Sequence, residues 1–126
     1  MHEALPGARL AAAIRSVTPN ASEMPYTCAE DTFVAWQRTG EALAASAGDR
    51  ALRMTAEFRV VILARGDYEK LKLKLYAALL LAGFELAAMP GESYNDTTQR
   101  RQWPIDVETV YDLSAAMAAD DEEENT

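Results

Sequence analysis

The chain has very little of the side-chain chemistry that most enzymes use. Its 126 residues include one cysteine, Cys28, and one histidine, His2. A single cysteine excludes an intrachain disulfide and a cysteine-based zinc cluster, so Cys28 is interpreted as a small buried apolar residue rather than a reactive thiol. His2 stands close to a terminus, where chains commonly fray. We therefore expect no enzyme activity, no catalytic residues, no cofactor and no metal site.

Long apolar runs are also missing. The longest one, residues 71–82, is interrupted by Lys72 and Lys74, and a membrane-spanning helix needs roughly 18 or more apolar residues. A basic stretch followed by a long apolar stretch is not found near the first residue, so no secretory signal is expected. The sequence predicts a cytosolic protein without a membrane partner.

Positive charge is scarce: the chain has 12 lysines and arginines but 20 aspartates and glutamates, which gives a formal net charge of −8. Five of the acidic residues lie together at positions 120–124. The remaining body does not suit the counterion-releasing surface that binds nucleic acid, so direct sequence-specific nucleic-acid binding is not expected. We predict one domain over residues 1–113 and a disordered acidic tail over residues 114–126.

Apolar residues recur at helical or strand spacing along much of the chain, and this periodicity predicts most of the helices and strands. The expected order α-β-β-α-β-β consists of a helix at 5–17, strands at 27–38 and 51–65, a helix at 67–82, and strands at 84–88 and 103–112. Residues 39–50 fit either a helical turn or a long loop, and Pro104 indicates a sheet edge or a bulge. The pattern is typical of a single α+β domain with a mainly antiparallel sheet and helices packed on one face.

The helix predicted at 67–82 has clear ends and two apolar sides. Asp67 is placed to cap its first turn, and Gly83 to end it in the left-handed conformation. One apolar stripe should pack on the sheet; its members are Tyr68, Leu71, Leu75, Ala78, Leu79 and Ala82. A second apolar side consists of Leu73, Tyr76 and Leu80. Either another subunit or the first helix of the same subunit could cover that second side.

The strand predicted at 51–65 also has two different sides. Its second side is polar at one end and apolar at the other, where Val61 and Leu63 lie. A buried strand face is apolar, whereas a solvated face is polar. We expect this second side to be partly covered.

The stretch GESYN at residues 91–95 is similar to the nucleophile elbow of hydrolases but lacks residues that this motif requires. A nucleophile elbow needs glycine at its fifth position, where this chain has Asn95, and Ser93 has no base to activate it. A turn fits better, with Asp96 bonding backbone amides and Thr97 supporting it. Arg100 and Arg101 could bind a phosphate or stack on a base near Trp103. An exposed strand start explains the two arginines more simply.

Several short motifs occur in an order that resembles one protein family. MPYT at 24–27 precedes Val34, Trp36 and Gln37, GDYEK at 66–70 opens the predicted helix, AGF at 82–84 closes it, and SYNDT at 93–97 leads into the last strand. In this order the motifs resemble the tail terminator, or tail-completion, proteins of long-tailed phages. The resemblance covers residues 24–113 and leaves out the acidic tail.

The resemblance implies an α+β subunit that assembles into a homo-oligomeric ring, commonly a hexamer, on the end of the tail tube. Such a ring stops tube polymerisation and forms the surface that joins tail to head, with the major tail tube protein and a head–tail connector protein as partners. It would lie in the virion, at the head-proximal end of the tail, after assembly in the host cytoplasm. Tyr94, Asp96 and Thr97 would form the family's turn, and the side with Leu73, Tyr76 and Leu80 a subunit interface.

Two alternatives remain open from the sequence. A neck or head-completion protein would be a related virion component that binds the portal side instead of the tube. An acidic inhibitor that mimics DNA or binds a host enzyme would belong to another class, and it would depend on the acidic residues at 120–124.

Overall fold

A computed structural model describes residues 5–44, 53–113 and 117 of the chain. It contains two helices and a six-stranded mixed sheet, which confirms a single α+β fold. In chain order the elements are α1 (Pro6–Arg15), β1 (Ala21–Glu23), β2 (Thr32–Leu43), β3 (Arg53–Ala64), α2 (Glu69–Leu81), β4 (Glu85–Ala88), β5 (Ser93–Asn95) and β6 (Arg100–Asp112).

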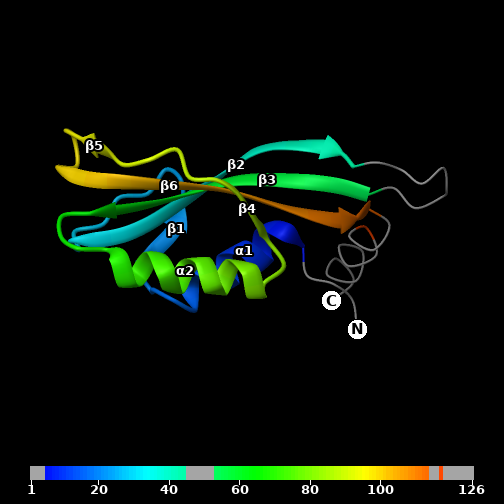
Figure 1. Cartoon of the computed structure of the whole chain (residues 1–126), viewed down its shortest axis with the longest axis horizontal. Coiled ribbons are helices and arrows are strands. Elements are labelled where there is room, and N and C mark those ends of the chain that lie inside the picture. Colours follow the sequence, from blue (N-terminus) through cyan, green and yellow to red (C-terminus); the bar gives the residue numbers. More distant parts are fainter. Residues whose placement is uncertain (1–4, 45–52, 114–116, 118–126) are drawn as a thin grey trace.

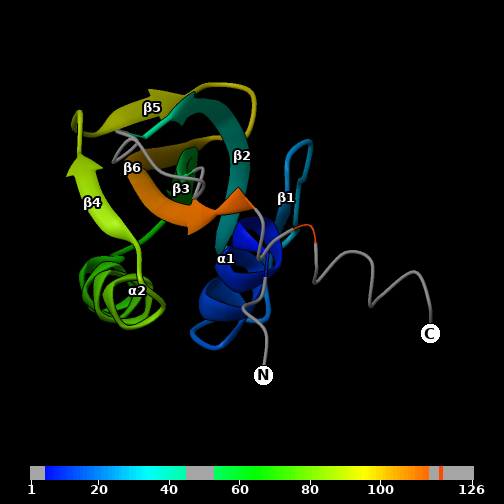
Figure 2. The same cartoon turned by 90° about the vertical axis from the view of Figure 1, so that its right-hand side faces the viewer.

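The sheet has the order β1-β2-β3-β6-β4, and β5 pairs with another part of β6. Every pair is antiparallel except β1 with β2, which is parallel. Both helices lie on the same side of the strongly twisted sheet (Figures 1 and 2), as the sequence predicts. The predicted sheet type and helix placement are therefore confirmed.

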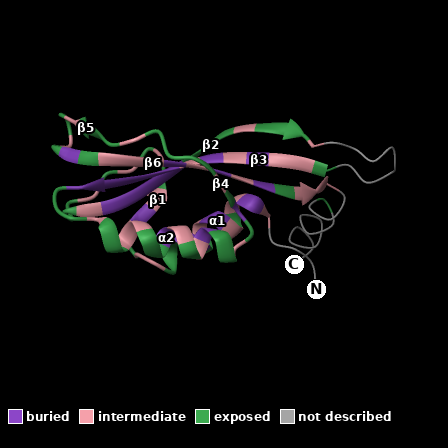
Figure 3. Ribbon diagram, in the orientation of Figure 1, coloured by how far each residue is buried: buried purple, intermediate pink, exposed green. Residues whose placement is uncertain are grey.

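The main core lies between the helices and the sheet (Figure 3). Leu10 and Ile14 of α1 and Leu75 and Leu79 of α2 are fully buried there. They meet alternate residues of the central strands, which are Val34, Trp36, Ala56, Phe58, Val60, Ile62, Ala64, Ile105 and Val107. Burying one such aliphatic side chain contributes about 1.5–3 kcal/mol. The predicted sheet-facing stripe of the second helix is confirmed.

A smaller apolar cluster lies on the opposite face of the sheet. Phe33 and Ala35 of β2 and Val61 and Leu63 of β3 are buried there, although neither α1 nor α2 covers that face. The segment that follows β1 covers them instead, through Met24, Tyr26 and Cys28. The second side of β3 is thus partly covered, as its mixed polarity predicts, and half-buried Cys28 packs as a small apolar residue.

The strands differ from the prediction in several places. β2 begins at Thr32 rather than at position 27, and β6 begins at Arg100 rather than at position 103. β1 and β5 have three residues each, too few for hydrophobic alternation to reveal. The undecided stretch after position 38 continues β2 as far as Leu43, past a bulge between Arg38 and Gly40. A Cβ at Gly40 would lie 3.0 Å from Glu57 Oε2, so glycine allows this close approach. Residues 45–50 of that stretch lie outside the described residues, as does the predicted acidic tail except for Met117.

Pro104 lies inside the sheet rather than in an edge strand, because β6 has partners on both sides. On one side it is the register partner of Val61 in β3. On the other side β5 pairs with residues 100–102 and β4 with residues 106–108. Pro104 therefore occupies a local gap in the pairing, where β6 needs no donor toward a neighbour.

The predicted C-terminal end of α2 is confirmed, whereas the helix begins at Glu69 after Tyr68 as its N-cap, later than the predicted start at 67. Asp67 nevertheless bonds the first helical amide. The Asp67 carboxylate accepts a hydrogen bond of 3.0 Å from the Glu69 amide. At the other end Gly83 has φ +91°, its amide donates to Leu80 O, and the Phe84 amide donates to Leu79 O. These two bonds form a Schellman motif, which satisfies carbonyls that the helix leaves unpaired.

Replacing Gly83 with alanine is expected to lower the free energy of unfolding by about 1–2 kcal/mol, because a side chain at positive φ is strained. The new Cβ would also lie 3.1 Å from Arg9 Nη1. Urea unfolding followed by circular dichroism measures the change. Gly66→Ala is the matched control, since its Cβ would meet nothing within 4 Å. Equal losses in the two variants would contradict the conformational explanation.

Candidate interaction surface

The outward side of α2 is unusually apolar for a helix on a protein surface. Leu73 is 59% exposed, Leu80 56% and Leu81 89%. Helical spacing places them beside exposed Lys70, Lys74 and Ala77. We call these six residues the α2 outer face. Neighbouring apolar side chains exposed in this way are typical of a contact surface.

Tyr76 does not belong to this outer face, contrary to the sequence prediction. It is half-buried against the main core, and its Oη accepts a 2.9 Å hydrogen bond from Trp103 Nε1 of β6. α1 packs against α2 within the subunit but leaves Leu73 and Leu80 exposed. Two of the three predicted interface residues therefore face outward, whereas the third anchors α2 to the sheet.

Beside the start of α2, charged and aromatic groups close a polar hollow of about 160 Å³. Its lining residues are Asp67, Tyr68, Glu69, Lys72, Glu92 and Arg101. Lys72 pairs with Glu69 at 2.7 Å and lies 4.7 Å from the centre of the Trp103 ring. Burial, and then the hydrogen bond that the Tyr68 phenol donates to Glu92, raises the pKa of Tyr68 to about 12. The charged and hydroxyl groups around the hollow thus bond to one another, and their contacts hold the start of α2 against the sheet.

The face of the sheet opposite the helices has a row of three glutamates. Glu108 of β6 is the register partner of Glu57 in β3 on one side and of Glu85 in β4 on the other. Like charges placed directly opposite across strands are destabilising. Within the described part of the chain, no cation pairs with any of the three. The neighbouring Arg59 is already bound by Asp106, with both carboxylate oxygens accepting.

A groove of about 250 Å³ runs beside this glutamate row. Its polar walls include Glu57 and Glu108, and its apolar parts include Ala87 and Ala88 of β4; the other lining residues are Thr39, Phe58, Arg59, Asp106 and Val107. We call it the β4 groove. It combines small apolar side chains with acidic walls on the side of the sheet away from the helices.

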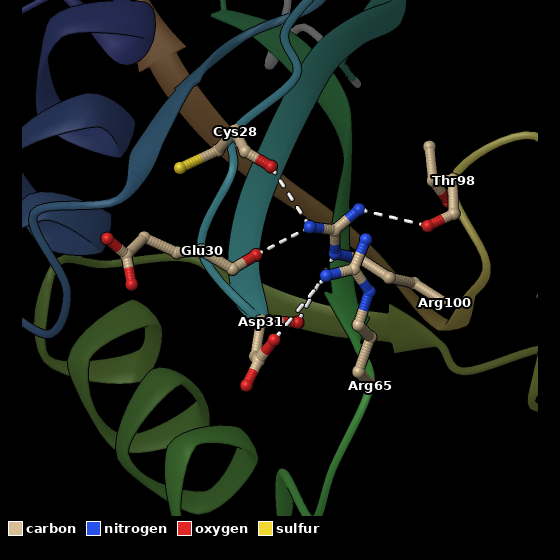
Figure 4. A network of polar contacts seen from close by, with 6 residues as sticks. All are labelled: Cys28, Glu30, Asp31, Arg65, Thr98 and Arg100. Carbon is tan, nitrogen blue, oxygen red and sulfur yellow. Dashed lines mark hydrogen bonds and ion pairs between the residues drawn. The ribbon is translucent and has the colours of Figure 1, made fainter.

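Arg100 is buried rather than exposed, which corrects the sequence prediction. Only 4% of the residue is exposed. Its guanidinium donates to the carbonyl oxygens of Cys28, Glu30, Asp31 and Thr98 (Figure 4). It also lies 4.9 Å from the centre of the Phe33 ring. Because its donors are engaged, Arg100 has no role in binding phosphate and instead fastens the 28–31 segment to β6.

Arg101 points elsewhere and is exposed. It donates to Gly66 O at 3.0 Å and lies over the Tyr68 ring, so it too makes contacts within the subunit. Trp103 packs against the core instead of forming an exposed stacking platform. The group Arg100, Arg101 and Trp103 therefore does not form a site for a base.

The motif residues Tyr94, Asp96 and Thr97 lie in the β5–β6 hairpin. Tyr94 pairs with Arg101 in register and is exposed, and residues 96–99 form the turn. The side chain that bonds a backbone amide is Asn95, whose Oδ1 accepts from Thr98 at 3.0 Å. The predicted turn is present, but Asn95 has the role that the sequence assigned to Asp96. Asx residues commonly close turns in this way.

Residues 5–44, 53–113 and 117 include no group of three or more His, Cys, Asp or Glu side chains placed to hold a metal ion. No helix among them is long and apolar enough to cross a membrane. A search of protein-family models found no match to the chain, and a search of curated proteins found no relative.

Proposed function

We propose that the chain is a tail terminator subunit, which forms a ring on the end of a phage tail tube and stops its polymerisation. The α2 outer face is the observation that supports this proposal. It remains exposed although the opposite stripe of α2 already packs on the sheet. A subunit with a finished core and an unused apolar surface is suited to association.

The nature of the assembly comes from the sequence resemblance over residues 24–113. A ring requires a heterologous contact, in which one surface of each subunit binds a different surface of the next. The two sides of this subunit differ strongly, because helices cover one face of the sheet and the other has polar rows. The fold is thus compatible with head-to-tail association around a closed ring.

Light scattering and electron microscopy test the assembly, and a tube-growth assay tests the function. We expect the wild-type chain to form rings and to block further addition of tube protein. Leu73→Asp combined with Leu80→Asp should remove both effects, because association would then bury carboxylates at the contact. Leu43→Asp is the matched control, since Leu43 is equally exposed but lies on β2. A strictly monomeric wild-type protein that also fails to block tubes would refute the proposal.

Two further measurements separate the alternatives. Pull-down with purified tube protein and with portal protein distinguishes a terminator from a head-completion protein; we expect the tube protein to be retained. Deleting residues 114–126 tests the acidic inhibitor. A terminator should still assemble without them, whereas an inhibitor acting through those acidic residues should lose its activity.

A further inference from the structure

We propose that the α2 outer face of one copy binds the β4 groove of a second copy. The inference builds on the proposed function, since it names the two surfaces of the contact between subunits. It rests on the charge and shape of the two surfaces in this chain. The α2 outer face is exposed, the β4 groove is open to solvent between exposed Ala87 and Ala88 and half-buried Glu57 and Glu108, and the two surfaces lie on opposite sides of the sheet.

The α2 outer face is basic as well as apolar. Lys70 and Lys74 are exposed on the same side of Leu73, and no ion pair involves either lysine within the described residues. Lys72 is engaged differently, because it pairs with Glu69 inside the subunit. A partner for this face must therefore accept leucine side chains and provide negative charge around them.

The β4 groove meets both requirements. Ala87 and Ala88 provide small apolar surface against which leucine side chains can pack. Glu57 and Glu108 wall the groove, and Glu85 extends the row at the sheet border. Lysines brought close to the row would also relieve the repulsion between its neighbouring carboxylates.

Charge also decides which surfaces can meet. Two α2 outer faces in contact would oppose lysines to lysines, and two β4 grooves would oppose glutamates to glutamates. Only the head-to-tail arrangement brings opposite charges together, and such a contact can be repeated from copy to copy around a ring. The charges thus select the heterologous contact over symmetric dimers.

Charge reversal provides the test. The first variant combines Lys70→Glu with Lys74→Glu, and the second combines Glu57→Lys with Glu108→Lys. Each alone has like charges across the contact, so we expect self-association to weaken about tenfold or more. In an equimolar mixture every contact can again join opposite charges if the two variants alternate, so assembly should return. Light scattering measures the mass of each sample, and native mass spectrometry counts the two variants in each particle.

Two controls keep the result interpretable. Glu23→Lys combined with Glu30→Lys changes the net charge as much as the second variant does, at exposed positions outside the β4 groove, and should assemble like wild type. A single chain that has all four charge reversals should assemble by itself, because both surfaces change sign together. Its recovery would also show that the separate variants had not failed simply by unfolding.

Several outcomes would overturn the inference. They are a wild-type chain that stays monomeric at its highest soluble concentration, separate variants that assemble as wild type does, and folded variants whose mixture does not assemble. The proposed function is tested separately by the tube-growth assay. If assembly follows the charge pattern but tubes continue to grow, the contact is correct and the terminator function is wrong.

Discussion

Replacing Arg100 with alanine is expected to lower the free energy of unfolding by about 3–5 kcal/mol, one of the two largest losses we expect from a single substitution in this chain. Four carbonyl oxygens would lose their donor, at distances that are now 2.6–3.3 Å. The Phe33 ring would lose the guanidinium over its face. Guanidinium chloride unfolding followed by tryptophan fluorescence measures the loss.

Arg101→Ala is the matched control, because the two arginines are adjacent in β6 but differ in burial. Arg101 is exposed and donates one hydrogen bond, to Gly66 O, so its loss should stay below about 1 kcal/mol. Arg100→Lys should fall between them, since an ammonium group keeps the charge but lacks the planar fork of donors. Similar losses for Arg100→Ala and Arg101→Ala would show that the buried network contributes little.

Leu79→Ala is expected to lower the free energy of unfolding by about 2–5 kcal/mol, because it removes a fully buried side chain between α2 and the sheet and leaves a cavity. The adjacent Leu80→Ala should change the stability of the separated subunit by less than about 0.5 kcal/mol, since Leu80 faces outward. Thermal or urea unfolding of both variants at low protein concentration gives the comparison.

In self-association the order should be reversed, with Leu80→Ala having a larger effect than Leu79→Ala. We expect Leu80→Ala to weaken self-association, because Leu80 belongs to the α2 outer face. A Leu80→Ala loss of stability as large as that of Leu79→Ala would mean that Leu80 is buried within the subunit. The two measurements therefore separate the apolar stripe that stabilises the fold from the side that we propose as the contact between copies.

Periodic apolar residues made the long elements predictable. The α2 stripe with Leu75 and Leu79 and the alternation along β3 repeat over several turns or pleats, so they predicted both the element type and the buried side. The C-terminal end of α2 was also predictable, because Gly83 acts through local backbone chemistry, and the Asp67 bond to the Glu69 amide lies close to the predicted start. The exposed leucines at 73 and 80 followed from the same helical spacing.

Features that depend on strand register could not be read in this way. Glu57, Glu85 and Glu108 are far apart in the sequence and become neighbours only when β3, β4 and β6 pair. Arg100 resembled an exposed charge because its four acceptors are backbone carbonyls, which any residue type provides. Helical spacing alone places Tyr76 on the same side as Leu73 and Leu80, and its hydrogen bond with Trp103 of β6 depends on tertiary packing that the spacing does not reveal.

The bulge between Arg38 and Gly40 affects whether strands of other chains can add to the edge of this sheet. Beyond Trp36, β1 no longer pairs with β2, and none of the described strands pairs with residues 37–43 on that side. A long, flat stretch of this kind could recruit strands from other chains without limit. The bulge distorts this stretch, and Arg38 and Glu41 place a charged pair on it. Together they disfavour open-ended strand addition at this edge, which is compatible with the proposed closed ring held by side-chain contacts.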